Sequence, residues 1–136
     1  MVSMQGDELG SLAARAYEAY VNRDEDTVRE LVSENVVWHS LEGGGSFHDY
    51  NGIDEVLRFV NQAARMAAIE GTFEVEIGEI FTHGSYGVGL HTASMEGKGG
   101  SLLDREVLVG RAEGGKIVEI WQFFEDPAKT KEFFGY

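Results

Sequence analysis

The side chains best suited to move a proton at neutral pH are the histidines, of which the chain has four. An imidazole with a pKa of about 6.5 can take up or release a proton without large tuning. His39 lies at the end of a short apolar run, and its imidazole could transfer a proton. His91 lies in an alternating run and is expected to line a cavity. His48 follows a glycine-rich segment and could lie at the mouth of that cavity. The alternative for each is a core or lining histidine without chemistry.

Acidic and tyrosine side chains supply a second set of candidates. Asp104 directly precedes Arg105 in an alternating run. Since successive residues of a strand point to opposite faces, Asp104 and Glu106 share one face and Arg105 lies on the other. Only one of these faces can line a cavity, and the pattern leaves open which. If Arg105 turns toward Asp104, the carboxylate stays ionised in a salt bridge.

Tyr17 and Tyr20 lie on an apolar stripe of residues 8–22, and each hydroxyl group could donate a hydrogen bond to a ligand. Tyrosines on such a stripe are more often core residues with the hydroxyl at the edge. Gln122 lies in an almost continuously apolar run. Its amide could orient a ligand but cannot take up a proton.

Several kinds of site are not expected. The chain has no cysteine, which excludes disulfides, zinc–thiolate sites and cysteine nucleophiles. No two histidines have the HxH or HxxxH spacing, so we expect no metal site. The glycine run at 43–45 lacks both the GxGxxG spacing and the helix behind it that a nucleotide site needs. We therefore expect no cofactor.

The net charge of −13 limits the partners. Phosphate binding needs clustered Lys and Arg, so we expect neither nucleic acid nor an anionic membrane surface as a partner. A strongly solvated surface explains the charge, and an acidic site for a cationic partner is the alternative. Residues 1–7 have no basic or apolar region of a signal peptide, and no apolar stretch approaches the roughly 18 residues of a membrane span. We expect a cytoplasmic protein.

Three helices are predicted in the first half of the chain. Apolar residues recur at intervals of three and four through 8–22 and again through 52–68. Between these segments, Asp24 or Asp26 can cap a second, short helix. Pro127 can open a further short helix at the C-terminal end, over 128–134.

The remaining predicted elements are strands, over residues 36–39, 73–77, 86–95, 102–109 and 117–124. Short turns join the last four, which is typical of an antiparallel meander. No linker or repeat divides the chain, so residues 1–136 are predicted to form one α+β domain. Helices packed on the concave face of a curved antiparallel sheet would enclose an apolar pocket.

Four segments, taken in order, resemble the SnoaL-like branch of the NTF2-like superfamily. They are AYEAYVNRD at 16–24, VVWH at 36–39, YNGIDEV at 50–56 and GKIVEIWQFFEDP at 115–127. The resemblance implies a cone-shaped α+β fold, with three N-terminal helices on a curved antiparallel sheet, and a homodimer through the outer sheet face. Such relatives include isomerases, polyketide cyclases, epoxide hydrolases, dehydratases and non-catalytic binding proteins, so the fold alone does not give the function.

The resemblance also implies site residues. Relatives of the ketosteroid isomerase type carry an aspartate base at the position of His39, a protonated aspartic acid at that of Asp104 and a hydrogen-bonding tyrosine at that of Tyr17. Tyr20, one turn later, is a competing donor, and a histidine in place of the aspartate base departs from the pattern. Epoxide hydrolases of this type have an aspartate where this chain has Gln122, which argues against their mechanism.

Two functions fit these residues. The first is a cofactor-independent isomerase, cyclase or dehydratase that acts on an apolar cyclic or polyketide-like substrate by acid–base catalysis, with His39 as base and Asp104 and Tyr17 as donors. The second is a non-catalytic protein that binds a small hydrophobic ligand. Convergence of the three polar groups on one cavity would favour the first, and polar groups on separate faces would favour binding or packing alone. The expected ligand-binding residues are Trp38, Tyr20, Phe59, Met66, His91, Gln122 and Phe124.

Overall fold

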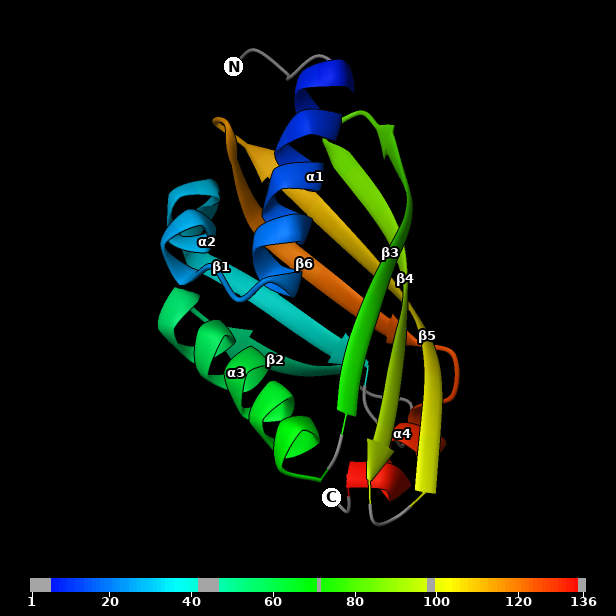
Figure 1. Ribbon diagram of the computed structural model, residues 1–136. Coiled ribbons are helices and arrows are strands. Elements are labelled where there is room, and N and C mark those ends of the chain that lie inside the picture. Colours follow the sequence, from blue (N-terminus) through cyan, green and yellow to red (C-terminus); the bar gives the residue numbers. More distant parts are fainter. Residues whose placement is uncertain (1–5, 42–46, 71, 98–99, 135–136) are drawn as a thin grey trace.

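The computed structural model describes residues 6–41, 47–70, 72–97 and 100–134, whose arrangement is shown in Figure 1. The elements follow one another as α1 (Gly6–Val21), α2 (Glu25–Leu31), β1 (Val32–Leu41), β2 (Phe47–Asn51), α3 (Ile53–Glu70), β3 (Thr72–His83), β4 (Tyr86–Gly97), β5 (Gly100–Glu113), β6 (Lys116–Phe124) and α4 (Pro127–Phe134). The predicted α+β class with three N-terminal helices is confirmed, and α4 begins at the only proline. The glycine run at 43–45 lies outside the described residues.

The N-terminal helices form where their apolar stripes can be buried. α1 buries the stripe formed by Leu9, Leu12, Ala16, Tyr17 and Ala19. In the turn that follows, Arg23 adopts a left-handed φ of 55°. Asp24 then caps α2 by accepting a hydrogen bond from the Thr27 backbone N–H at 3.2 Å. Of the two caps that the sequence allowed, Asp24 is therefore the one used.

Six strands form one sheet in the order β2-β1-β6-β5-β4-β3. The last four strands of the chain make the predicted antiparallel meander. β1, however, pairs with β6 in parallel, with Trp38 opposite Ile120. The expectation of a wholly antiparallel sheet is wrong at this pair, because the long crossover through α3 and the meander returns the chain in the same direction.

β2 is a strand that the sequence pattern did not predict. It runs antiparallel to β1 at the edge of the sheet, with Tyr50 opposite Trp38. Four of its five residues are exposed. A strand exposed in this way needs no alternation of apolar and polar residues, so its periodicity gives no signal.

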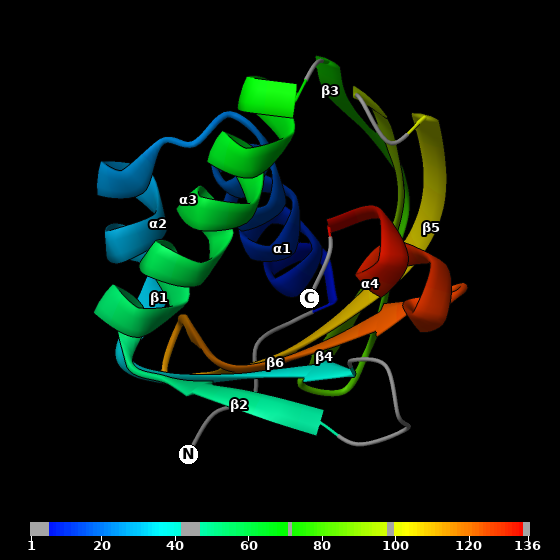
Figure 2. The ribbon, with the colours of Figure 1, turned by 90° about the horizontal axis from the view of Figure 1, so that it is seen from below.

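The sheet curves around the helices, as the view in Figure 2 shows. The register shifts between Ile77 and Ile80 in β3 and between Arg111 and Ala112 in β5. Such irregularities bend a strand and increase its twist. α1 and α3 lie against the concave side of the sheet, so alternate residues of the central strands point into the interior.

One hydrophobic core joins the helices to the sheet. Its buried members come from α1, α2, α3, β1, β5 and β6, and Trp38 and Val36 of β1 lie at its centre with 3% and 0% of their surface exposed. A second, smaller cluster contains Ala93, Met95 and Leu102. The interior also contains buried polar residues, namely Ser40, His91, Asp104, Glu106 and Gln122.

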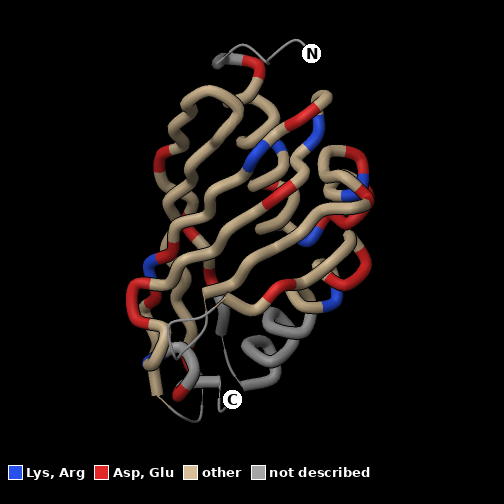
Figure 3. Tube along the Cα trace, turned by 180° about the vertical axis from the view of Figure 1, so that it is seen from behind, with Lys and Arg blue, Asp and Glu red and all other residues tan. Residues whose placement is uncertain are grey.

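Acidic residues outnumber basic ones by 24 to 11. Figure 3 shows the molecule from the sheet side, with charged positions interspersed along otherwise uncharged strands. Within the part of the chain that the structure describes, no helix is both long enough and apolar enough to cross a membrane.

Candidate active site

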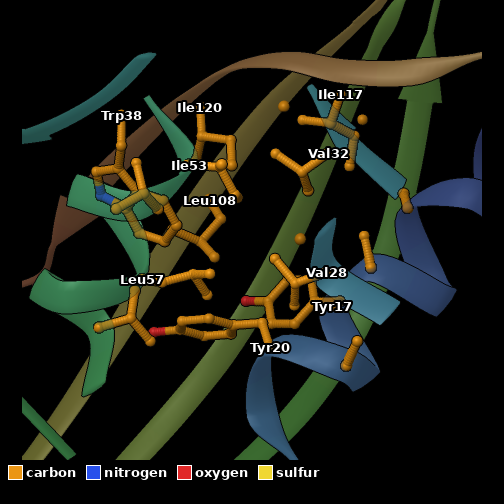
Figure 4. Close-up of a pocket in the computed structure, with 18 of the residues that line it drawn as sticks. Tyr17, Tyr20, Val28, Val32, Trp38, Ile53, Leu57, Leu108, Ile117 and Ile120 are labelled. Carbon is orange, nitrogen blue, oxygen red and sulfur yellow. The ribbon is translucent and has the colours of Figure 1, made fainter. Parts of the chain in front are cut away.

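An apolar pocket lies between the helices and the concave face of the sheet. Its volume is about 90 Å³. Side chains from α1, α2, α3 and the inner face of the sheet surround it, and those labelled in Figure 4 are Tyr17, Tyr20, Val28, Val32, Trp38, Ile53, Leu57, Leu108, Ile117 and Ile120. Among the labelled side chains, only Tyr17 and Tyr20 carry oxygen, in their hydroxyl groups.

Three glycines on the inner face of the sheet make room for this pocket. Gly87 and Gly89 of β4 and Gly110 of β5 all line it, and Gly87 pairs with Gly110. A Cβ atom on Gly89 would overlap the ring of Tyr17. The absence of a side chain at Gly89 is thus what allows Tyr17 to pack against β4.

A buried chain of polar contacts begins at Tyr17. The Tyr17 hydroxyl is hydrogen-bonded to His91 Nδ1, and His91 Nε2 lies 3.4 Å from Glu106 Oε2. Gln122 Nε2 donates to Glu106 Oε1 at 2.5 Å. Trp38 Nε1 donates in turn to Gln122 Oε1 at 3.1 Å. Side chains from α1, β1, β4, β5 and β6 therefore form one network beside the pocket.

Asp104 and Glu106 form a pair of buried carboxyl groups on the inner face of β5, with 2% and 8% of their surface exposed. Burial, the nearby charge of Glu106 and a hydrogen bond to Glu106 raise the pKa of Asp104 to about 8. Among the described residues, no hydrogen-bond partner reaches Asp104 Oδ2. At neutral pH Asp104 is therefore a carboxylic acid with one oxygen still open to a partner.

The two pocket tyrosines remain neutral. Burial raises the pKa of Tyr17, and the proximity of Tyr20 and Glu106 raises it further. Burial and the charge of Glu106 likewise raise the pKa of Tyr20. Both groups are therefore hydroxyls that can take part in hydrogen bonds but do not ionise at neutral pH.

This arrangement is suited to acid–base chemistry. A protonated carboxylic acid can donate a proton, its partner carboxylate can accept one, and neutral hydroxyls can orient a ligand in an otherwise apolar space. Within the described residues, no three His, Asp or Glu side chains are grouped so that they could hold a metal ion.

The sequence pattern of the SnoaL-like domain matches residues 13–120, a span from α1 into β6 that includes most of the pocket. The chain belongs to the SnoaL-like domain family. No curated protein matches the chain.

Solved structures share this SnoaL-like fold at low sequence identity. Bal32a, from a soil-derived mobile gene cassette, is 21% identical, with 95% of this chain and 98% of that chain covered at a TM-score of 0.83. A Kribbella flavida protein named as a candidate ketosteroid isomerase is 14% identical, with coverage of 89% and 80% and a TM-score of 0.72. IdmH of Streptomyces antibioticus, named as a candidate polyketide cyclase, is 18% identical, with coverage of 86% and 91% and a TM-score of 0.69. These similarities confirm the fold expected from the resemblance.

In this SnoaL-like domain, His39 lies on the face of the sheet opposite the pocket. Its neighbours in β1, Trp38 and Ser40, are buried on the inner face. His39 Nδ1 lies 2.7 Å from Asp49 Oδ1 and its Nε2 lies 2.6 Å from Glu119 Oε2. His39 therefore does not converge with Tyr17 and Asp104 on one cavity, because adjacent strand residues point to opposite faces.

The strand of Asp104 turns its acidic face inward. Glu106 accompanies Asp104 into the interior, whereas Arg105 lies on the outer face and donates from Nε to Glu125 Oε2 at 2.6 Å. The possibility that Arg105 keeps Asp104 ionised is therefore excluded. Tyr17 lies in both the pocket and the polar network, and Tyr20 lines the pocket one turn later.

The predicted lining residues occupy several different places. Trp38 and Tyr20 line the pocket, while His91 and Gln122 belong to the polar network. Phe59 contacts Trp38 edge to face, with ring centroids 6.0 Å apart. Phe124 instead borders a groove together with Arg105 and Glu125. Met66 lies on α3, and its side chain is outside the described part of the structure; His48 lies on the exposed edge strand β2.

Two polar residues of the site were not singled out from the sequence. Ser40 donates to Gln122 Oε1 at 3.3 Å, and Glu106 is the central acceptor of the network. Strand alternation already placed Glu106 on the same face as Asp104. Two acidic residues two positions apart in a strand with a buried face were the signal that could have identified this pair.

Proposed function

We propose that this SnoaL-like protein is a cofactor-independent isomerase, cyclase or dehydratase that acts on a small apolar molecule by general acid–base catalysis. The observation that carries the proposal is the Asp104–Glu106 pair. Asp104 keeps a proton at neutral pH and has an unpaired oxygen atom, and Glu106 is an adjacent carboxyl group. A general acid works best when its pKa lies near the operating pH, and the pKa of Asp104, about 8, meets this condition.

In this proposal the carboxyl pair takes the proton-transfer role that the resemblance implied for His39. Asp104 donates a proton to the oxygen atom of the reacting molecule, and Glu106 takes up the proton that leaves its carbon. Tyr17 and Tyr20 orient the polar group of the ligand, since both line the pocket. The names of two structural neighbours, a candidate ketosteroid isomerase and a candidate polyketide cyclase, agree with this class of reaction.

The pocket favours a small reacting group. Its volume is about 90 Å³, whereas a cavity of about 150 Å³ is known to hold benzene. The group inside the pocket is thus a short branched chain or a small ring. A larger substrate would extend toward the rim, where Arg23, Glu25 and Asn61 border the pocket.

The test is an exchange assay that needs no knowledge of the natural substrate. An acid–base site that enolises a ketone replaces its α-hydrogens by deuterium in D₂O, and NMR follows this exchange in cyclopentanone. We expect the wild-type protein to accelerate exchange, and Asp104→Asn and Glu106→Gln to slow it by about 10²-fold or more. Asp49→Asn, on the outer face, is the matched control and should exchange at the wild-type rate. A folded Asp104→Asn protein with full activity would contradict the proposal.

A specific observation favours the alternative of a non-catalytic binding protein. Tyr17, His91, Glu106, Gln122 and Trp38 already satisfy one another, so the network could serve only to hold the pocket open. In that case cyclopentanone would bind to the protein and shift its NMR signals, but no variant would change the rate of deuterium exchange, which would equal the rate in buffer.

We further propose that a second copy of this chain covers the outer face of the sheet. Support comes from large apolar side chains that are exposed on β2, β4 and β5, namely Phe47, Tyr86, Leu90 and Leu103. Exposed apolar side chains that cluster on one face are typical of an interaction surface.

A further inference from the structure

The hydrogen bonds of the buried network lead from two sides toward Glu106. An indole N–H can only donate, so Trp38 Nε1, 3.1 Å from Gln122 Oε1, fixes that atom as the acceptor. Ser40 Oγ donates to the same oxygen at 3.3 Å. The Gln122 amide nitrogen must therefore face Glu106, to which it donates at 2.5 Å. The orientation of Gln122 follows from its neighbours and leaves Glu106 as an acceptor.

Glu106 is the point at which the donors of the network meet. It accepts from Gln122 at Oε1, and the protonated carboxyl group of Asp104 is hydrogen-bonded to it. His91 Nε2 lies 3.4 Å from its other oxygen, Oε2. A ring nitrogen that faces a carboxylate in a buried site must carry hydrogen, because two lone pairs would otherwise repel each other.

The hydrogen on Nε2 fixes the tautomer of His91 and, through it, the direction in which the Tyr17 hydroxyl group donates. His91 is 4% exposed, and a neutral imidazole, with one N–H and one bare nitrogen, matches a carboxylate on one side and a hydroxyl group on the other. With hydrogen on Nε2, the other ring nitrogen, Nδ1, is an acceptor. The Tyr17 hydroxyl must then donate its hydrogen to Nδ1. Its oxygen keeps only lone pairs for a ligand.

We infer that the pocket selects a small apolar molecule that carries a hydroxyl group, and that this group donates a hydrogen bond to the Tyr17 oxygen. The inference rests on the proposed function insofar as it takes the apolar pocket to be the ligand site, and it names the ligand class. It also reverses the role that the resemblance implied for Tyr17, which was that of a hydrogen-bond donor to a ligand oxygen. His91 acts here as a positioning residue, because it fixes the direction of the Tyr17 hydroxyl.

The test compares two probes of nearly equal shape, cyclopentanol and cyclopentanone, of which only the alcohol can donate a hydrogen bond. NMR titration gives the dissociation constant of each. We expect the wild-type protein to bind cyclopentanol about tenfold more tightly, the value of one hydrogen bond of roughly 1.4 kcal/mol. Tyr17→Phe should lose this preference, whereas Tyr86→Phe, the matched control at an exposed tyrosine outside the pocket, should keep it. Preference for the ketone, equal affinity or no saturable binding of either probe would overturn the inference.

A second measurement does not depend on any ligand or on the folding of a variant. The ¹⁵N chemical shifts of the His91 ring report which nitrogen carries hydrogen, and we expect hydrogen on Nε2 alone in the free protein. Hydrogen on Nδ1 would make Tyr17 a donor to the ligand and would overturn the inference. Failure of the proposed function is distinguishable, because a site without catalysis would show no deuterium exchange while the preference for cyclopentanol persisted.

Discussion

Gly89 lies beneath the ring of Tyr17, and its hydrogen atom leaves just enough space for that ring. A methyl group at this position would overlap the ring, so Gly89→Ala must displace Tyr17 from both the pocket and His91. We expect the substitution to lower the free energy of unfolding by about 1–3 kcal/mol, which is typical of overpacking. Urea denaturation measures this change.

Gly110→Ala is the matched control for this prediction. It lies on the same inner face, and its added Cβ would lie 3.8 Å from Ile117 Cγ2, an ordinary contact. We expect this variant to change the free energy of unfolding by less than about 1 kcal/mol. If Gly89→Ala is no less stable than Gly110→Ala, the close approach of Tyr17 to β4 does not determine the packing here.

At the scale of single residues, the sequence indicated which residue types could form a site better than it indicated which face of the sheet each side chain occupies. Asp104, Tyr17 and Tyr20 were predicted as site residues, and all three lie on the inner side of the sheet. His39 was assigned to the pocket, yet it points outward. The run that contains it begins with two valines and a tryptophan, so apolar residues occur on both faces and alternation does not show which face is buried. Only the packing of Trp38 against α1 and α3 decides this.

At the scale of the elements, His39 joins three strands on the outer face. It belongs to β1, and it contacts Asp49 of β2 and Glu119 of β6, while Arg111 of β5 also contacts Glu119 at 3.2 Å. Burial alone would lower the pKa of His39, but the hydrogen bonds to the two carboxylates outweigh burial and raise it. His39 therefore links the edge strand to the centre of the sheet, and it does so most strongly when its imidazole is protonated.

The raised pKa gives this link a defined pH dependence. A group whose pKa is higher in the folded state stabilises the protein fully below its unfolded pKa, and this contribution is lost as the pH rises through the folded pKa. We expect His39→Asn to lower the free energy of unfolding by about 1–2 kcal/mol near pH 6 and by less near pH 9. Urea denaturation at the two pH values tests this. His83→Asn, an exposed histidine, is the control, and an equal effect of His39→Asn at both pH values would refute this role of His39.

Sequence periodicity predicted those helices and strands that bury one face. α1, α3 and the meander strands have periodic apolar residues, and all of them were found. β2 was missed because it is exposed, and the parallel pairing of β1 with β6 was missed because residues more than 80 positions apart leave no local pattern. The pocket could be anticipated from the curved sheet, but its size could not, because it depends on Gly87, Gly89 and Gly110 facing the same space.

At the scale of the whole molecule, association must overcome a net charge of −13 on each copy. Like charges repel, and salt screens them. We expect the proposed homodimer to dissociate at low ionic strength and to strengthen as salt is added, as measured by sedimentation equilibrium. Leu90→Lys, on the outer face, should abolish the dimer. Ser11→Lys, an equal charge change on the exposed side of α1, should not; a dimer that survives Leu90→Lys would place the contact elsewhere.

The hydrogen bond between Trp38 and Gln122 joins residues 84 positions apart, and it has a consequence for how the protein is made. A ribosome releases the N-terminal half of a chain first, so β1 emerges long before the strand that will lie beside it. Until β6 is translated, the indole of Trp38 has no acceptor and the edges of β1 and β5 are unpaired. A translation product that stops before β6 would therefore present two open strand edges, the feature that promotes aggregation. The final strand thus determines whether a nascent chain becomes a stable protein or a target for chaperones and proteases.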